Sequence, residues 1–169
     1  TARMAVRASI TGHLVLSTLH TNDALGGIFR LLDMKIEPFL LASTLRTVIA
    51  QRLVRRLCLD CRREATFAEK IATEIISSLQ ELPLEMITKE VPELKSLEDI
   101  KSWKIYEAVG CDRCSRTGYQ DRTAIAEIVN INEQLQDLII NHRQDLSLEK
   151  IKAGQPFISI KQAGLFKVL

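Results

Sequence analysis

The sequence has almost no excess charge and no apolar run long enough to cross a membrane. Its 23 Lys and Arg residues against 21 Asp and Glu residues leave a net charge of +2. That is too near balance to indicate a protein that binds nucleic acid or an anionic membrane. No hydrophobic stretch approaches the roughly 20 residues that a transmembrane helix needs, and no signal-peptide pattern opens the chain. These absences favour a cytoplasmic protein.

The sequence also has no start methionine, internal repeat or low-complexity tract. It begins at Thr1 directly with a helical pattern, and residues 164–169 stop within an apolar pattern. We therefore expect a piece cut from a longer protein. The 169 residues, 46% of them hydrophobic, are enough for a packed core.

A phosphate-binding loop is missing too. The motif G-x-x-x-x-G-K-S/T does not occur, and Gly26-Gly27 lies inside a helical pattern without a following lysine. We therefore expect that this chain alone does not hold the phosphates of a nucleotide.

The first third of the chain predicts helices around one buried strand. Residues 2–10 have helical apolar spacing, and Thr11-Gly12 interrupts it. The mostly apolar run 13–19 is predicted to form a buried, parallel strand. Residues 21–23 are suited to helix N-caps, so a helix should follow, with His20 where strand becomes helix. After Pro38 another helix is predicted to continue to Leu57.

Residues 66–103 differ from the rest and predict an insertion of small helices. They are charged and helical in pattern, with capping-box matches at Thr66 with Glu69 and at Ser96 with Asp99. Beyond them, residues 122–131 alternate as a strand does, and Asn132 should cap another helix. An α/β pattern therefore resumes after the insertion.

All four cysteines fall into two C-x-x-C pairs, Cys58 with Cys61 and Cys111 with Cys114. Two residues between thiolates let a tight knuckle aim both sulfurs at one ion, and two knuckles complete an all-thiolate tetrahedral shell. We interpret the four as ligands of a structural zinc ion. Because no coordination position stays open for water or substrate, this zinc should perform no catalysis.

Another interpretation of the cysteines is a pair of redox or disulfide sites, or a site that binds no metal in this chain. A reducing cytosol disfavours disulfides. The 49 residues between the pairs exceed the usual ribbon spacing, but a helical subdomain can fold between them and bring the knuckles together.

His20 is the candidate contact to a nucleotide. Ligands of open α/β sheets bind beyond the carboxyl ends of strands, where helix N-termini offer free donors to anions. We therefore hypothesise that His20 contacts or senses a γ-phosphate; capping or packing at the strand end is the alternative. His13 would lie about 23 Å away along an extended strand, which suggests a structural or inter-subunit role. His142 is expected to be solvated.

Five arginines form a basic run that could contact an anion or an acidic neighbouring subunit. A solvated helix face is the commoner explanation of such a run. Its members are Arg52, Arg55, Arg56, Arg62 and Arg63.

The order of several blocks resembles one protein family. The run TARMAVRASITGHLVLSTLHTNDA resembles the histidine box of the type II secretion and type IV pilus assembly ATPases. The likeness continues through RLLDMKIEPFLLAS, AQRLVRRLC with the first C-x-x-C, GCDRCSRTGY with the second, DRTAIAEI and QAGLFKVL. Together these blocks span nearly all of the chain outside residues 66–103.

The resemblance implies the C-terminal part of a cytoplasmic, RecA-like P-loop ATPase. Members of the family form homo-hexamers, bind ATP and Mg²⁺, and drive assembly at the inner face of the cell membrane, where they meet platform proteins. Their Walker A and Walker B segments precede the block that begins here, so this chain alone should be inactive. The match puts His20 near the γ-phosphate, makes His13 the first histidine of the box, and equates Cys58, Cys61, Cys111 and Cys114 with the tetracysteine zinc site.

We expect from this an α/β fold: the C-terminal half of a RecA-like domain with a helical zinc-binding insertion and a helical C-terminal piece. The expected segments are 1–57 for the ATPase core, 58–116 for the zinc subdomain and 117–169 for the returning strand and C-terminal helices. Three positions depart from the pattern, since the family often has glycine where this chain has Lys35, Asp121 and Ala124.

Two hypotheses from other classes compete with the motor. One is a zinc-ribbon module that grips nucleic acid with its arginines, which predicts salt-dependent binding to DNA or RNA. The other is an adaptor whose zinc subdomain docks a membrane partner. Secretion, pilus and DNA-uptake motors share these blocks, so the branch stays open.

Overall fold

The computed structural model describes all residues, 1–169, and divides the chain into two compact units. The first unit comprises Thr1–Gln51 and Ala126–Ser159, and the second comprises Arg52–Ile125 and Ile160–Leu169. Helices and strands occur in both units, so the expected α/β class is confirmed at that level. The two units do not coincide with the three segments expected from the sequence, and that functional division stays a prediction. No helix has the length and hydrophobicity that crossing a bilayer would require.

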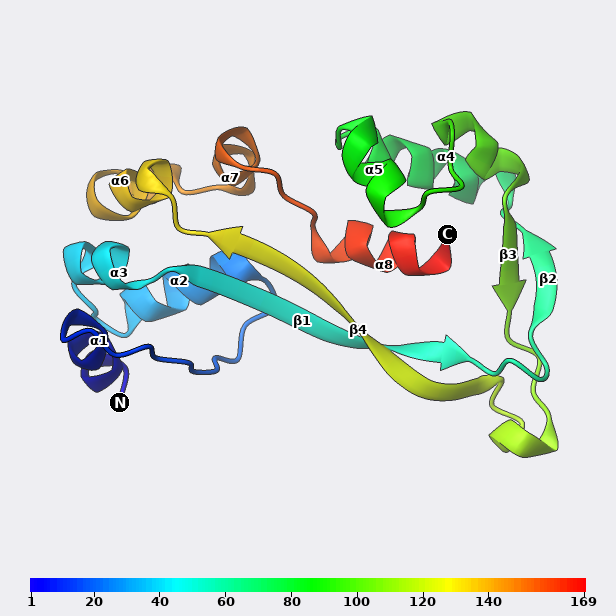
Figure 1. Cartoon of the computed structure of the whole chain (residues 1–169), viewed down its shortest axis with the longest axis horizontal. Helices are drawn as coiled ribbons and strands as arrows, with labels where there is room; N and C mark the ends of the chain where they lie inside the picture. The colour runs from blue at the N-terminus through cyan, green and yellow to red at the C-terminus, as the bar shows by residue number, and fades with distance from the viewer. The chain divides into compact units, whose positions relative to one another are not determined.

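Two long strands, β1 (Thr47–Leu57) and β4 (Tyr119–Asn130), pair with each other and pass through both units. The N–H of Ile131 donates to the carbonyl of Arg46 at 2.8 Å, and the N–H of Cys58 donates to the carbonyl of Gly118 at 3.0 Å. These bonds at opposite ends fix an antiparallel pairing, visible as opposed arrows in Figure 1. The strand expected over residues 122–131 is therefore confirmed.

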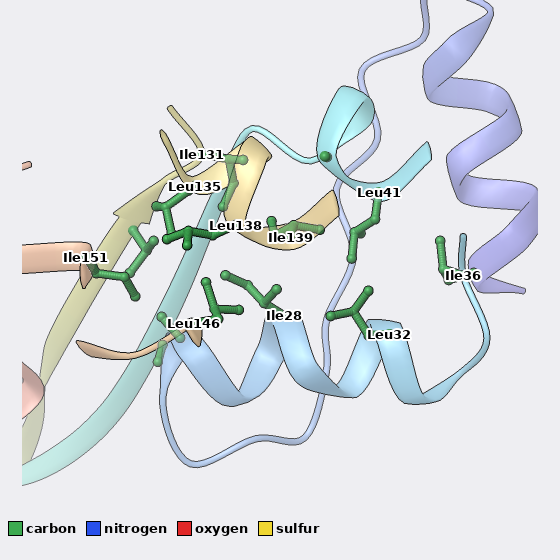
Figure 2. Packing of buried hydrophobic residues seen from close by; sticks show 14 of the residues in the cluster. Ile28, Leu32, Ile36, Leu41, Ile131, Leu135, Leu138, Ile139, Leu146 and Ile151 are labelled. Carbon is green, nitrogen blue, oxygen red and sulfur yellow. The ribbon is translucent and has the colours of Figure 1, made fainter. Parts of the chain in front are cut away.

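The first unit surrounds its part of these strands with helices. They are α1 (Ala2–Ile10), α2 (Ala24–Asp33), α3 (Pro38–Thr44), α6 (Glu133–Asn141), the 3₁₀ turn η3 (Arg143–Asp145) and α7 (Leu148–Gly154). Figure 2 shows Ile28 and Leu32 of α2 pointing toward the side of the core that Leu138 and Ile139 of α6 supply. The Asn132 side chain accepts the N–H of Leu135 at 3.0 Å, so the expected cap of α6 is confirmed.

The second unit contains the insertion. Its elements are β2 (Arg63–Thr66), α4 (Glu69–Leu79), α5 (Leu84–Glu90), the 3₁₀ helix η1 (Leu97–Ser102), β3 (Lys104–Glu107), the 3₁₀ turn η2 (Asp112–Cys114) and α8 (Ile160–Val168). The small helices between 66 and 103 and the capping box of Ser96 with Asp99 are confirmed. The box at Thr66 is wrong, because Thr66 ends β2 and Ala68 precedes α4. The antiparallel pair β2–β3 was not expected.

The strand predicted over residues 13–19 is wrong in this structure. The segment follows an irregular path from α1 to α2, with Leu14 and Leu16 88% and 87% exposed. A strand needs a neighbour to satisfy its backbone hydrogen bonds, and the two sheets pair only β1 with β4 and β2 with β3. His20 therefore lies in this irregular segment, three residues before the N-cap of α2, rather than at the end of a strand.

The helix predicted to run from Pro38 to Leu57 is also wrong beyond Thr44. Leu45 has an extended backbone and ends α3, and β1 begins two residues later. The apolar positions of 45–57 fit a helical period, but β-branched Val48 and Ile49 suit a strand, and pairing with distant β4 decides the outcome.

Candidate metal centre

The two cysteine knuckles lie where the paired strands β1 and β4 end and begin. Cys58 follows the last residue of β1, and η2 carries Cys114 just before β4 starts at Tyr119. The bond from the N–H of Cys58 to the carbonyl of Gly118 joins the two chain segments at this point. Strand pairing therefore brings together cysteines that lie 53 positions apart.

Two glycines shape the second knuckle, and both have left-handed backbones. Gly110 has φ +112°, and a Cβ there would lie 2.6 Å from the carbonyl oxygen of Arg116. Gly118 has φ +76°, and a Cβ there would lie 2.7 Å from the Cβ of Ala108. Either position would clash and be strained with a side chain, so the turn requires glycine at both.

The four sulfurs converge on one point. The Sγ atoms of Cys58 and Cys111 are 4.0 Å apart, those of Cys61 and Cys114 3.9 Å, and those of Cys111 and Cys114 3.8 Å. All four lie within 4.8 Å of one another. A regular tetrahedron with Zn–S bonds of about 2.3 Å has S–S edges of roughly 3.8 Å, so the donor set fits such an ion. The thiols are free and form one cluster rather than two separate pairs.

Backbone donors already favour the thiolate form of one cysteine. The N–H groups of Cys111 and Gly118 each donate to the Sγ of Cys114 at 3.2 Å. These bonds, the one from Cys111 first, outweigh burial and lower the pKa of Cys114 to about 6. These two donors therefore favour the thiolate of Cys114 over its thiol.

In the first pair, Cys58 and Cys61, the pKa values of both thiols are raised. Burial raises the pKa of Cys61 to about 12, although the N–H of Gly110 donates to its sulfur at 3.3 Å. At Cys58 the N–H of Asp60 lowers the pKa, but burial and the neighbouring Cys111 outweigh it, so the net shift is upward. These thiols must give up protons when they coordinate a metal.

The two histidines of the first third lie apart from this cluster in the sequence and have different surroundings. His13 Nδ1 lies 3.1 Å from the hydroxyl of Thr11 and 3.2 Å from the carbonyl of Ala8, so the ring caps the end of α1. His20 is exposed in the irregular segment before α2. The structure thus gives His13 a local structural contact and leaves the imidazole of His20 accessible.

The N-terminus of α2 does not offer the free donors that we expected for an anion. The N–H of Ala24 donates to Glu127 Oε1 at 2.7 Å, and the N–H of Gly26 donates to Asp23 Oδ1 at 2.6 Å. The N–H of Gly27 donates to the carbonyl of Asp23. Two carboxylates of the chain itself therefore occupy the place where a phosphate would bind.

Comparison with known proteins identifies the family. The family model described as "Type II/IV secretion system protein" matches residues 1–169, the whole chain. The chain belongs to this family. It is 43% identical over 169 residues to the "Type II secretion system ATPase E" of Vibrio cholerae, and 40% identical over 171 residues to the "Type IV pilus assembly ATPase PilB" of Myxococcus xanthus.

The chain corresponds to only part of these secretion-family relatives. The alignment with the Vibrio protein covers 99% of this chain but 29% of that protein. The alignment with the Myxococcus protein covers 100% of this chain and 27% of that protein, and a "Type II secretion system protein E" of Aeromonas hydrophila gives 100% and 30%. The chain therefore spans less than a third of the length of each of these relatives.

The arginine run lies beside the cysteine knuckles, and three of its members contact neighbouring side chains. The guanidinium of Arg55 stacks over the ring of Tyr119 at 3.8 Å, and that of Arg62 stacks over Tyr106 at 4.0 Å. Arg63 forms an ion pair with Glu107 across the β2–β3 pair. The five arginines are exposed to solvent, as expected, but Arg52, Arg55 and Arg56 lie on strand β1, so the helix face expected for the run is wrong.

Glu127 was not among the functional residues predicted from the sequence. It is 4% exposed and lies on an inward position of β4, two residues before the fully buried Val129. The sequence did contain a signal for this residue: a carboxylate stands among the apolar residues that alternate along the strand. A charge buried at such a position requires a partner.

Proposed function

We propose that this chain is the C-terminal part of a hexameric cytoplasmic ATPase that powers type II secretion or type IV pilus assembly. The observation that carries the proposal is the match along the whole chain to relatives that are named as ATPases of both systems. The intact enzyme would work at the inner face of the cell membrane, against platform proteins of the assembly.

The proposed fold is the C-terminal half of a RecA-like domain. Residues 1–57 would carry the histidine box, 58–116 the zinc subdomain, and 117–169 the returning strand and C-terminal helices. The exposed leucines of segment 13–19 support this, because an apolar segment of that kind gains from burial against further chain.

In the proposed enzyme, Cys58, Cys61, Cys111 and Cys114 hold a structural zinc ion. The S–S separations and the single cluster support this assignment. The ion would keep the two knuckles together at the end of the β1–β4 pair, and four protein ligands leave no position for a reacting water.

ATP and Mg²⁺ would be held mainly by parts of the enzyme that this chain does not include. Its own contribution is His20, whose accessible imidazole could donate a hydrogen bond to a γ-phosphate oxygen and stabilise charge that develops there. His13, the first histidine of the box, is the weaker candidate for a phosphate contact because its ring already caps α1.

Turnover by three proteins tests the proposal: the intact ATPase, the 169-residue chain alone, and the intact His20→Ala variant. We expect turnover by the intact enzyme, none by the chain, and a loss of roughly 10²-fold or more in the variant, the usual size of a lost transition-state contact. His142→Ala, another exposed histidine, is the matched control and should keep full activity. Turnover by the chain alone, or full activity of His20→Ala, would contradict the assignment.

A nucleic-acid-binding or adaptor module is the competing function. No contact in the structure specifically favours either alternative. Arg55 and Arg62, which the nucleic-acid alternative would use, already stack on tyrosines. The nucleic-acid alternative predicts DNA or RNA binding whose affinity falls steeply with salt, and the motor predicts none. The adaptor alternative predicts that deletion of residues 66–103 abolishes partner binding, whereas the motor would keep its basal ATPase activity.

A further inference from the structure

Glu127 is a buried carboxylate with a long-range partner. It is 4% exposed on β4, and its Oε1 accepts the N–H of Ala24, 103 positions earlier in the chain, at 2.7 Å. Removing a carboxylate from water is costly unless hydrogen bonds compensate it. The positive end of a helix macrodipole provides further compensation, and Ala24 is the first residue of α2.

This bond is one of three contacts that fix where α2 begins. The Asp23 carboxylate caps the helix through the N–H of Gly26 at 2.6 Å. Gly27 lies so close to β1 that a Cβ there would be 3.0 Å from Cγ1 of Val48. The cap acts within the helix, whereas Glu127 and Gly27 tie the helix to β4 and β1.

The same bond limits the position of His20. His20 lies only four positions before Ala24, so its Cα stays within about 14 Å of the anchored N–H. Thr21 shortens this connection further, since its hydroxyl donates to the carbonyl of Asp23 at 3.1 Å. Loss of the Glu127 bond would free the start of α2 and the segment before it.

We propose that Glu127 is a positioning residue for His20: its carboxylate holds the first turn of α2 against β4 and thereby sets where the imidazole meets the nucleotide. This inference rests on the proposed ATPase function. It gives Glu127 no contact with substrate; it acts through the backbone of Ala24 and the segment that carries His20.

Two variants of similar length separate the hydrogen bond from the charge, both made in the intact ATPase. Glu127→Gln loses the charge but keeps an oxygen that accepts the Ala24 N–H, whereas Glu127→Met fills the same space without an acceptor. We expect kcat to fall about tenfold in the Met variant with the KM for ATP changed less than twofold, since misplacing a group by 1 Å can cost up to 10²-fold. The Gln variant should keep at least half of the wild-type kcat.

A structural readout accompanies the kinetics. Hydrogen exchange at the amides of Ala24 and Gly26 should accelerate in the Met variant and stay near wild type in the Gln variant. Glu149→Ala, at an exposed position of α7, is the control and should change neither kinetics nor exchange. If the Met variant does not fold, Glu127→Asp keeps the charge, is one methylene too short for the bond, and should give the same kcat loss.

The outcomes distinguish this inference from the function on which it rests. If His20→Ala keeps full activity, the proposed role of His20 fails whatever Glu127 does. If His20→Ala loses activity while Glu127→Met, or Asp in its place, keeps wild-type kcat and KM, the positioning role is wrong. When both single variants lose activity, the double variant should be no slower than His20→Ala alone; a fully additive loss would overturn the inference.

Discussion

Arg113 and Asp60 form an ion pair between the two cysteine knuckles, with Nη1 and Oδ1 2.6 Å apart. Each residue lies between the two cysteines of its own pair, so the ion pair bridges the same segments that a shared metal would join. Both side chains are well exposed, at 71% for Arg113 and 41% for Asp60. The pair therefore lies at the solvent side of the cluster.

This bridge should contribute little to stability. In a double-mutant cycle of Asp60→Asn and Arg113→Gln, we expect a coupling below about 1 kcal/mol in chemical unfolding of the metal-loaded chain, decreasing with added salt. Metal stoichiometry should be unchanged in all three variants. A coupling of several kcal/mol, or loss of the ion from either single variant, would show that the bridge rather than the thiolates holds the knuckles.

Replacement of a single cysteine should have a much larger effect. Cys61→Ser removes one thiolate from the four that surround the site, so we expect metal content, measured by elemental analysis after gel filtration, to fall below half of the wild-type value. Ser77→Ala, an exposed change in α4, is the control and should keep full stoichiometry. Equal metal content in the Cys61 variant would exclude a four-thiolate site.

Proton release on metal binding should reflect the unequal pKa values. The pKa of Cys114 is lowered to about 6, so at pH 7.5 we expect this sulfur to release no proton when it binds the metal. The pKa of Cys61 is raised to about 12 and that of Cys58 is also raised, so each of these thiols must release one proton. We expect about two to three protons per zinc, from calorimetry in buffers of different ionisation enthalpy. Four protons would contradict the thiolate at Cys114. The bound ion should dissociate as the pH falls, because protons compete for every sulfur.

Replacement by glycine should stabilise two positions whose backbones are left-handed. Lys35 and Asp121 have φ of 60° and 66°, and Lys35 terminates α2 by donating its N–H to the carbonyl of Leu32. Since a left-handed backbone costs a non-glycine residue roughly 1–2 kcal/mol, Lys35→Gly should stabilise the first unit by up to about 1 kcal/mol. Asp121→Gly should gain less, because aspartate tolerates this region.

Ala124 is the matched control for these substitutions. It lies in β4 and is not among the residues with positive φ. Ala124→Gly should therefore destabilise by about 0.5–1 kcal/mol through added freedom of the unfolded chain. Urea unfolding of the three variants checks the signs; stabilisation by Ala124→Gly or destabilisation by Lys35→Gly would contradict the backbone argument.

Local signals in the sequence predicted those elements whose causes are themselves local. Asn132 caps α6 and Ser96 pairs with Asp99 because the bonding groups lie three residues apart. The C-x-x-C spacing likewise predicted two knuckles, and the structure joins them in one cluster.

Elements that depend on distant partners could not be predicted in this way. Residues 45–57 have apolar positions that fit a helix, and only pairing with β4 makes them a strand. Residues 13–19 have strand composition but no strand beside them. Glu127 was missed for the same reason, since its partner Ala24 lies 103 positions away.

We propose that four cysteines from two distant knuckles hold one structural metal ion. The first test is elemental analysis of the purified chain, combined with circular dichroism before and after chelation. We predict about one zinc per chain and a loss of ordered structure when a chelator removes it. A metal-free chain with four reactive thiols and an unchanged spectrum after chelation would contradict the claim.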